Sequence, residues 1–310
     1  MNHSITLFNL FGIPFRINYT WLIIFGLVLT SMALYQFPAT YPHWSPLEQW
    51  LIAGVTTLLF FTSVVLHELS HSLLALRNGI PVKSITLFIF GGIAHIAKEA
   101  ERPRVEAVIA LAGPISSLLI GVAFALLAYF VGPLNEEVEA VATTLAIINI
   151  MLAVFNLLPG FPMDGGRVLR ALLWAITGNY MKATRVATII GRIVAYTMIA
   201  GGATLVFFGF WRNGIWLVFV GLFLNTAAVA GYRQSLQREA LRRYQIGDLM
   251  APVTEAVAVA EGAPFIEASA DATEVMEYME EKDLQRVLVV RDGRVVGIVN
   301  RGVFRSPDDR

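Results

Sequence analysis

The chain has 310 residues, of which 56% are hydrophobic and only 15% are charged, whereas a soluble globular protein usually carries about 25% charged residues. This composition indicates a membrane protein. The chain contains no cysteine, which excludes disulfide bridges and thiolate metal sites. Any metal ion must therefore be held by His, Asp or Glu.

The formal net charge of zero hides a division between two parts of the chain. The part up to Arg238 holds nine acids and fourteen Lys or Arg residues, and the remainder holds fourteen acids and nine Lys or Arg residues. The first part is apolar and basic, while the tail is acidic. We therefore predict a membrane domain over residues 1–240 and a small soluble domain over residues 244–310.

Six stretches of the first part are apolar over roughly 20 residues, which is the length that a helix needs to cross a bilayer. No cleavage site of a signal peptide follows the N-terminal residues, so the first stretch is expected to be retained. The six predicted spans are Tyr19–Phe37, Gln49–Leu76, Val105–Val131, Val138–Leu158, Ala183–Phe208 and Ile215–Tyr232.

Basic residues alternate between the loops that join these spans. The loops after the first, third and fifth spans hold one Lys or Arg between them, whereas several follow the second, fourth and sixth spans. Because cytoplasmic loops carry the excess of Lys and Arg, we predict that both termini and the loops after the second and fourth spans are cytoplasmic.

One of these basic loops contains a stretch, Val82–Ala97, that is rich in β-branched and aromatic residues and is broken by Gly91-Gly92. It is too short to cross a bilayer as a helix. Its composition predicts a β-hairpin or small sheet at the cytoplasmic face. Because open sheet edges do not face lipid, other parts of the protein must shelter it.

The second span contains the sequence His67-Glu68-Leu69-Ser70-His71. The spacing of four residues puts both imidazoles on one face of a helix, where they can share a zinc ion, and Glu68 can act as the general base. Packing alone is a poor alternative explanation. An ionisable group at bilayer depth costs roughly 2.5 kcal/mol or more unless it has a partner.

A catalytic zinc ion needs a third protein ligand, and Asp164 is the best candidate. Seven other acids before Glu239 fit span ends or loops, namely Glu48, Glu99, Glu101, Glu106, Glu136, Glu137 and Glu139. The fourth span is predicted to end on the same side as the second, so that Asp164 can meet the two histidines. Asp164 can alternatively be the N-cap of a helix over Gly165–Ile176, and the two roles are compatible.

These residues resemble the site-2 protease family of intramembrane metalloproteases. The resemblance implies one Zn²⁺ per chain held by His67, His71 and Asp164, with Glu68 as general base. It also implies that Asn156 assists binding of the substrate or the oxyanion, where the alternative is a helix-terminal cap. The matching segments are His67–His71, Gly91-Gly92, Ala112-Gly113-Pro114 and Asn156–Gly166.

Two other residues have competing interpretations. His95 is either a fourth metal-binding group or a residue of the predicted sheet. Arg192, within the fifth span, either reaches towards the cytoplasm along its aliphatic stem or faces the substrate. His43 is predicted to lie outside the site, as is His3, on grounds of topology.

The tail is predicted to form a small α/β unit. A helix is expected from a cap at Asp271 to about Lys282, followed by a hairpin of Arg286–Arg291 and Arg294–Val299 around Asp292-Gly293. With Ile246–Met250, this hairpin resembles a single CBS domain. Such modules usually pair, which implies a homodimer.

The same resemblance also bears on nucleotide binding. Val303 and Asn300 depart from the residues common in nucleotide-binding members, so nucleotide binding is expected to be weak or absent. No feature of the sequence points to nucleic acid.

The predicted fold is therefore an α-helical polytopic membrane protein with a small membrane-associated β-sheet and a CBS-like C-terminal domain. The resemblance implies a protease in a bacterial or archaeal plasma membrane. It would cut transmembrane segments of proteins such as anti-sigma factors or membrane-tethered transcription regulators. We expect an unwound substrate segment to add as a strand to Ser84–Ile96. The alternative is a CBS-regulated ion or solute transporter that uses the same ionisable residues as a cation pathway.

Overall fold

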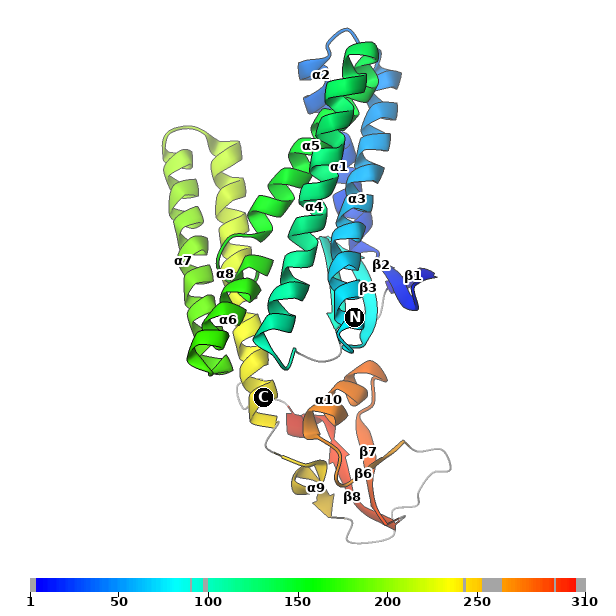
Figure 1. Cartoon of the computed structure of the whole chain (residues 1–310), viewed down its shortest axis with the longest axis vertical. Coiled ribbons are helices and arrows are strands. Elements are labelled where there is room, and N and C mark those ends of the chain that lie inside the picture. Colours follow the sequence, from blue (N-terminus) through cyan, green and yellow to red (C-terminus); the bar gives the residue numbers. More distant parts are fainter. Residues whose placement is uncertain are drawn as a thin grey trace. The chain divides into compact units, whose positions relative to one another are not determined.

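The computed structural model describes residues 4–89, 91–96, 100–241, 244–252, 264–292 and 294–304. The chain divides into two compact units, and the boundary falls in the sequence between Ala228 and Val229. The first unit contains the helical bundle and one sheet, and the second contains the small α/β fold of the tail (Figure 1). This boundary lies within helix α8, which runs from Trp211 to Leu241. The domain limits predicted from the sequence, 1–240 and 244–310, therefore stay a prediction.

All six predicted spans are present as helices that are long and apolar enough to cross a membrane. Their ends lie within a few residues of the predicted ones, except that the last helix continues nine residues past its predicted end at Tyr232. The helices are α1 (Thr20–Ser31) with its continuation η1 (Met32–Gln36) and α2 (Phe37–Thr40), α3 (Pro46–Arg77), α4 (Pro103–Val131) with η2 (Gly132–Leu134), α5 (Glu136–Asn156), α7 (Tyr180–Phe207) and α8 (Trp211–Leu241).

The outer surface of these helices is apolar. Large side chains such as Phe130, Phe207 and Leu22 are 68%, 85% and 63% exposed, which a protein surrounded by water would not tolerate over so many positions. Together with the six spans, this surface identifies an integral membrane protein.

Polar caps determine where three of the helices begin. Ser45 and Glu48 form a reciprocal capping box at the start of α3, followed by proline at the first helical position. Asn135 and Asn179 accept hydrogen bonds from the first turns of α5 and α7. These caps satisfy backbone N–H groups that have no partner within the helix.

A short helix, α6 (Asp164–Thr177), lies between α5 and α7 and does not span. It matches the predicted helix over Gly165–Ile176 to within one residue at each end. The helix ends at Gly178, whose φ of 66° lies in the left-handed region that glycine adopts most readily. The start of α6 places Asp164 where the chain leaves the turn after α5.

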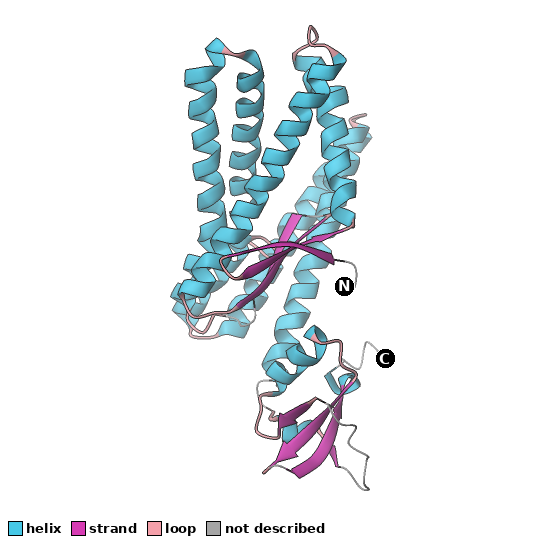
Figure 2. Ribbon diagram, turned by 90° about the vertical axis from the view of Figure 1, so that its right-hand side faces the viewer, coloured by secondary structure: helices cyan, strands magenta, loops and turns pink. Residues whose placement is uncertain are grey.

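The sheet of the first unit has four strands, β1 (Ser4–Leu10), β2 (Ile13–Asn18), β3 (Val82–Phe88) and β4 (Gly91–Ile96), in that order (Figure 2). The predicted hairpin is confirmed as β3 and β4, which pair antiparallel. The hairpin of β1 and β2 was not expected. It turns at Phe11-Gly12, and β2 joins β3 in parallel.

The sheet is sheltered by α3. Ile13, Phe15 and Ile85 pack with Leu69 in one buried cluster, and Leu69 lies between the two histidines of the motif. The sheet and the histidine-bearing turn of α3 therefore form a single packed layer. Strand β4 is an edge of this sheet.

The second unit has the strand order β5-β8-β7-β6 around a core that includes Ile246, Val275 and Met279. The predicted helix and hairpin are confirmed, and Asp271 caps the helix by accepting from the backbone of Thr273. Gly293, in the predicted turn, lies outside the described residues. The elements are α9 (Ile246–Leu249), β5 (Ala251–Pro252), β6 (Phe265–Glu267), α10 (Ala272–Glu281), β7 (Arg286–Arg291), β8 (Arg294–Asn300) and η3 (Arg301–Phe304).

Candidate metal centre

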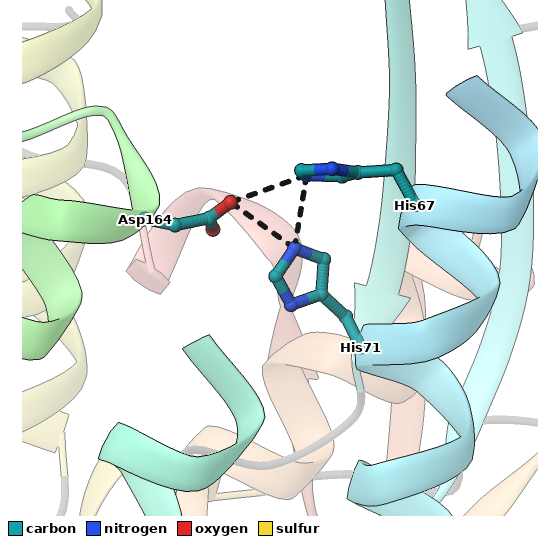
Figure 3. A group of neighbouring side chains, drawn as sticks. All are labelled: His67, His71 and Asp164. Atoms are coloured by element: carbon teal, nitrogen blue, oxygen red, sulfur yellow. Dashed lines mark hydrogen bonds and ion pairs between the residues drawn. The ribbon is translucent and has the colours of Figure 1, made fainter. Parts of the chain in front are cut away.

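The two histidines of the motif lie one turn apart on α3 and point to the same place. Their Nε2 atoms are 3.2 Å apart, and both side chains are buried, with 4% of each residue exposed. Figure 3 shows both rings facing Asp164, which approaches from α6. The helical period alone explains why His67 and His71 share a face.

Helix α4 orients both rings from behind. The Nδ1 of His71 is 2.7 Å from the carbonyl oxygen of Ile109, and the Nδ1 of His67 is 2.9 Å from the hydroxyl of Ser117. Because a carbonyl only accepts, His71 must carry a proton on Nδ1. In the neutral ring, Nε2 then carries the free lone pair. A neutral imidazole with a free lone pair is the form that binds a metal.

Asp164 closes the group from the opposite side. One of its oxygens, Oδ2, is 3.2 Å from Nε2 of His67 and 3.1 Å from Nε2 of His71. Asp164 is the first residue of α6 and Met163 occupies the N-cap position, so the alternative role of Asp164 as N-cap is wrong.

The turn before Asp164 is built from close backbone contacts. A Cβ on Gly165 would collide with the carbonyl oxygens of Leu157 and Leu158, and one on Gly166 would collide with the backbone of Gly160. Glycine is therefore needed at both positions. These contacts hold the start of α6 against the end of α5 and bring Asp164 to the histidines.

The geometry of the three side chains fits a metal ion. Ligand atoms about 2.0–2.1 Å from one tetrahedral zinc ion are about 3.3 Å from one another, and the three atoms here are 3.1–3.2 Å apart. A carboxylate oxygen against an imidazole lone pair also requires a positive centre between them. Among the described residues, His67, His71 and Asp164 are the group that could hold a metal ion.

Gly113 of α4 leaves room for this group. A Cβ built on Gly113 would lie closer than 3.0 Å to Nε2 of both His67 and His71, a separation that real Cβ atoms essentially never show. The space beside the two nitrogens is therefore present because this position has no side chain.

The metal-binding group opens on a cavity of ≈ 590 Å³. Glu68 and Asn156 both line this cavity, as does Arg167. Gly92 of β4 makes room for Glu68, because a Cβ there would approach its Cγ closer than 3.0 Å. The site residues predicted from the sequence therefore all meet at one cavity, and Glu68 lies beside the metal-binding group without being part of it.

Asn156 is the last residue of α5, and its amide donates to the carbonyl oxygen of Leu152. His95 lies in β4 opposite Ser84 and outside the metal-binding group. Burial lowers the pKa of His95, and Arg16 and Lys83 lower it further. Its position in the strand, outside the metal-binding group, agrees with its interpretation as a sheet residue.

His43 and Arg192 do not belong to the group either. His43 contacts Glu136 at 2.8 Å, and His3 lies outside the described residues. Arg192 is exposed and donates to Asn225 and to the hydroxyl of Tyr196.

Sequence reasoning missed several residues of the centre. Ser117, Ile109 and Arg167 were not singled out, because no local pattern links them to the motif. Glu106 was placed at a span end and Arg170 among the basic loop residues, but the two form a buried ion pair between α4 and α6. A buried charge with a distant partner has no signature in a single sequence.

Comparison with known proteins decides the family. The model of peptidase family M50 matches residues 55–134 and 133–201, and the CBS domain model matches residues 246–302. A zinc metalloprotease of Methanocaldococcus jannaschii is 30% identical over 302 residues, which are 97% of this chain and 79% of that protein. The chain belongs to peptidase family M50, the site-2 protease family.

Further relatives have related names. A candidate zinc metalloprotease of Synechocystis sp. is 38% identical over 81% of this chain, and the candidate zinc metalloprotease Rip3 of Mycobacterium tuberculosis is 36% identical over 74%. This M50 chain spans 66% and 58% of the length of these two proteins.

A solved structure confirms the membrane fold. The site-2 protease from Methanocaldococcus jannaschii has 31% sequence identity and a TM-score of 0.50, and the match covers 74% of this chain and 94% of that one. The predicted fold class and the predicted CBS domain are therefore confirmed. The transporter alternative is not favoured by any of these comparisons.

Proposed function

We propose that this M50 protein is an intramembrane zinc metalloprotease that hydrolyses peptide bonds of membrane proteins. The observation that carries the proposal is the spacing of three ligand atoms, 3.1–3.2 Å from one another, beside a glutamate in the same cavity. The relatives named as zinc metalloproteases support the choice of zinc and of peptide hydrolysis.

In this proposal His67, His71 and Asp164 hold one Zn²⁺ per chain. When bound, the ion supplies a Lewis acid that favours ionisation of water and polarises a carbonyl group. Glu68 takes the proton of the attacking water and returns it to the leaving amine. The amide of Asn156 faces the same cavity and donates a hydrogen bond to the substrate carbonyl as negative charge develops on its oxygen.

The proposed substrate is an apolar segment of another membrane protein. Much of the cavity lining is apolar and comes from the spans, including Phe60, Phe155 and Trp216. Gly91, Gly92 and Ala94 of the edge strand β4 line it as well, so an unwound substrate segment can pair with β4. Membrane-tethered regulators such as anti-sigma factors have the required form.

We place the active-site end of the bundle at the cytoplasmic side of a plasma membrane. The placement rests on the alternation of Lys and Arg between the loops. Arg170 is buried and does not contribute to this count, but Lys182 and Arg185 remain near the start of α7 and Arg102 and Arg104 near the start of α4. Both termini are then cytoplasmic.

The single CBS domain is proposed to pair with the same domain of a second chain. A two-fold dimer would satisfy a module that usually works in pairs. Nucleotide binding is expected to be weak or absent, because Val303 offers no carboxylate to a ribose hydroxyl pair.

Metal analysis of purified variants tests the assignment of roles. We expect His67→Ala, His71→Ala and Asp164→Ala to lose zinc, because each removes one of three ligands. Glu68→Gln should keep zinc and lose proteolysis, because it removes only the base. Zinc content is measured by mass spectrometry, and cleavage is measured on a membrane-protein substrate in the same detergent.

Glu136→Gln is the matched control, since it alters a hydrogen-bonded acid at the opposite end of α5. It should keep both zinc and activity. A Glu68→Gln protein without zinc, or an Asp164→Ala protein with full zinc and activity, would contradict the assignment.

A further inference from the structure

A buried ion pair links the helix behind the histidines to the helix that carries Asp164. Glu106, in the first turn of α4, is 1% exposed, and Arg170 of α6 is 7% exposed. The Nε of Arg170 donates to Oε1 of Glu106 at 2.6 Å, and its Nη2 contacts the same oxygen. The contact is therefore a charge-assisted one made by two nitrogens of one guanidinium.

Two aromatic rings hold the guanidinium as well. The Cζ of Arg170 is 4.8 Å from the ring centroid of Phe161 and 4.8 Å from that of Tyr180. Phe161 belongs to the turn that leads to Asp164, and its backbone N–H donates to the carbonyl oxygen of Ala187 in α7. Tyr180 is the first residue of α7. Arg170 thus ties together α4, α7 and the turn before Asp164.

The same helix α4 orients both halves of the metal-binding group. It contacts His71 through Ile109 and His67 through Ser117. Glu106 lies three residues before Ile109, on the same face of α4. Through Arg170 this residue reaches α6, less than two turns after Asp164. One helix therefore contacts the histidines directly and the aspartate-bearing helix through the ion pair.

Stability is a weak reason to keep such a pair. The free energy needed to remove two charges from water often exceeds the free energy gained from their attraction. Replacing a buried ion pair by apolar residues of similar volume therefore often leaves stability unchanged or raises it. A planar guanidinium that stacks on two rings and contacts a buried carboxylate instead fixes the positions of the elements that carry these groups.

We propose that Glu106 and Arg170 are positioning residues that set the distance from Asp164 to His67 and His71 and so determine the zinc affinity. The inference rests on the proposed function. Neither residue lines the cavity. Their proposed role is to hold the third ligand, Asp164, in place.

The test measures zinc affinity by competition with a chromophoric chelator, using the full-length protein in detergent. The double variant Glu106→Gln/Arg170→Met removes both charges with little change in volume. We expect a melting temperature close to that of the parent and zinc affinity about 10–100-fold weaker, as for other residues that orient metal ligands. The visible spectrum of the Co²⁺-loaded protein should change as well, because it reports the coordination geometry.

The single variant Arg170→Lys provides a second measurement. It keeps the positive charge but loses the planar fork and the stacking, so zinc affinity should also fall about 10–100-fold. Glu136→Gln is the control and should retain the affinity of the parent. Either Arg170 variant binding zinc like the parent, with an unchanged Co²⁺ spectrum, overturns the positioning role. A parent protein that binds no zinc would instead refute the proposed function.

Discussion

At the candidate metal centre, the residues without side chains are as important as the ligands. Gly113 lies beside the two imidazole nitrogens, and Gly92 lies beside the carboxylate-bearing side chain of Glu68. In both places an added methyl group would occupy space that the site requires. Helices α3 and α6 provide the ligands. The space for an ion between these ligands depends on Gly113 of α4.

This suggests a prediction for Gly113→Ala. Overpacking typically costs about 1–3 kcal/mol, and here the cost falls on the two histidine nitrogens. We expect zinc affinity to fall about tenfold or more, measured by chelator competition. Gly54→Ala is the matched control, because it makes the same change in α3 at a position with open space. Equal zinc affinity in both variants would show that the centre adapts to the added methyl group.

At the scale of elements, α3 and the four-stranded sheet work as one layer. Leu69 packs into the sheet from between His67 and His71. The edge strand β4 lines the cavity beside Glu68. Disturbing the sheet should therefore disturb the motif, although no strand residue belongs to the metal-binding group.

His95 gives the sheet a dependence on pH. Burial and the positive charges of Arg16 and Lys83 lower its folded-state pKa below its unfolded value of about 6.5. The unfolded state then binds more protons as the pH falls below about 6.5, so stability is lost from there down towards the folded-state pKa. We expect faster amide hydrogen exchange in β3 and β4 at pH 5 than at pH 8, after correction for intrinsic rates.

His95→Gln removes the titrating group and should abolish this difference between the two pH values. An equal difference in the variant would mean that another group is responsible.

The orientation of the spans can be tested because the chain has no cysteine. Asn78 lies exposed in the turn after α3, and Asn213 lies exposed in the first turn of α8. A cysteine at residue 78 should react with an impermeant maleimide only from the cytoplasmic side, and one at residue 213 only from the opposite side. The reverse labelling pattern would contradict the proposed orientation.

At the scale of the whole molecule, the chain joins a membrane unit to a small unit with its own core. The buried cluster of the second unit, which includes Ile246, Val289 and Val299, contains no residue of the spans. The metal-binding group lies wholly within the first unit. Zinc binding should therefore not need the tail.

Removal of residues 244–310 is expected to leave zinc binding unchanged but to alter the assembly state and the rate of cleavage. The reason is that the proposed dimer contacts lie in the CBS domain. Light scattering in detergent and cleavage assays measure the two effects. A truncated protein with the assembly state and rate of the parent would show that the tail does not regulate the enzyme.

Nucleotide binding by the tail is tested separately, by calorimetric titration of the full-length protein with ATP and AMP. Val303 is 44% exposed in η3 and has no acceptor for a ribose. We therefore expect no micromolar binding, and observing it would overturn this expectation.

The sequence by itself determined the features that depend on local periodicity. Six spans follow from apolar stretches of sufficient length, and the shared face of His67 and His71 follows from the helical period. The tail helix and hairpin follow from a cap and from alternating strands. Asp164 was found by elimination among few acids, which is possible because buried charge is rare in a membrane domain.

Only the tertiary structure decided which distant residues meet. The hairpin of β1 and β2 has short strands that acquire their place by pairing with β3. Ser117, Ile109 and Gly113 matter because α4 packs against α3 at the histidines. Glu106 and Arg170 pair although they are 64 positions apart in the sequence. Contacts of this kind depend on how whole helices pack, and the spacing of residues in one sequence does not predict them.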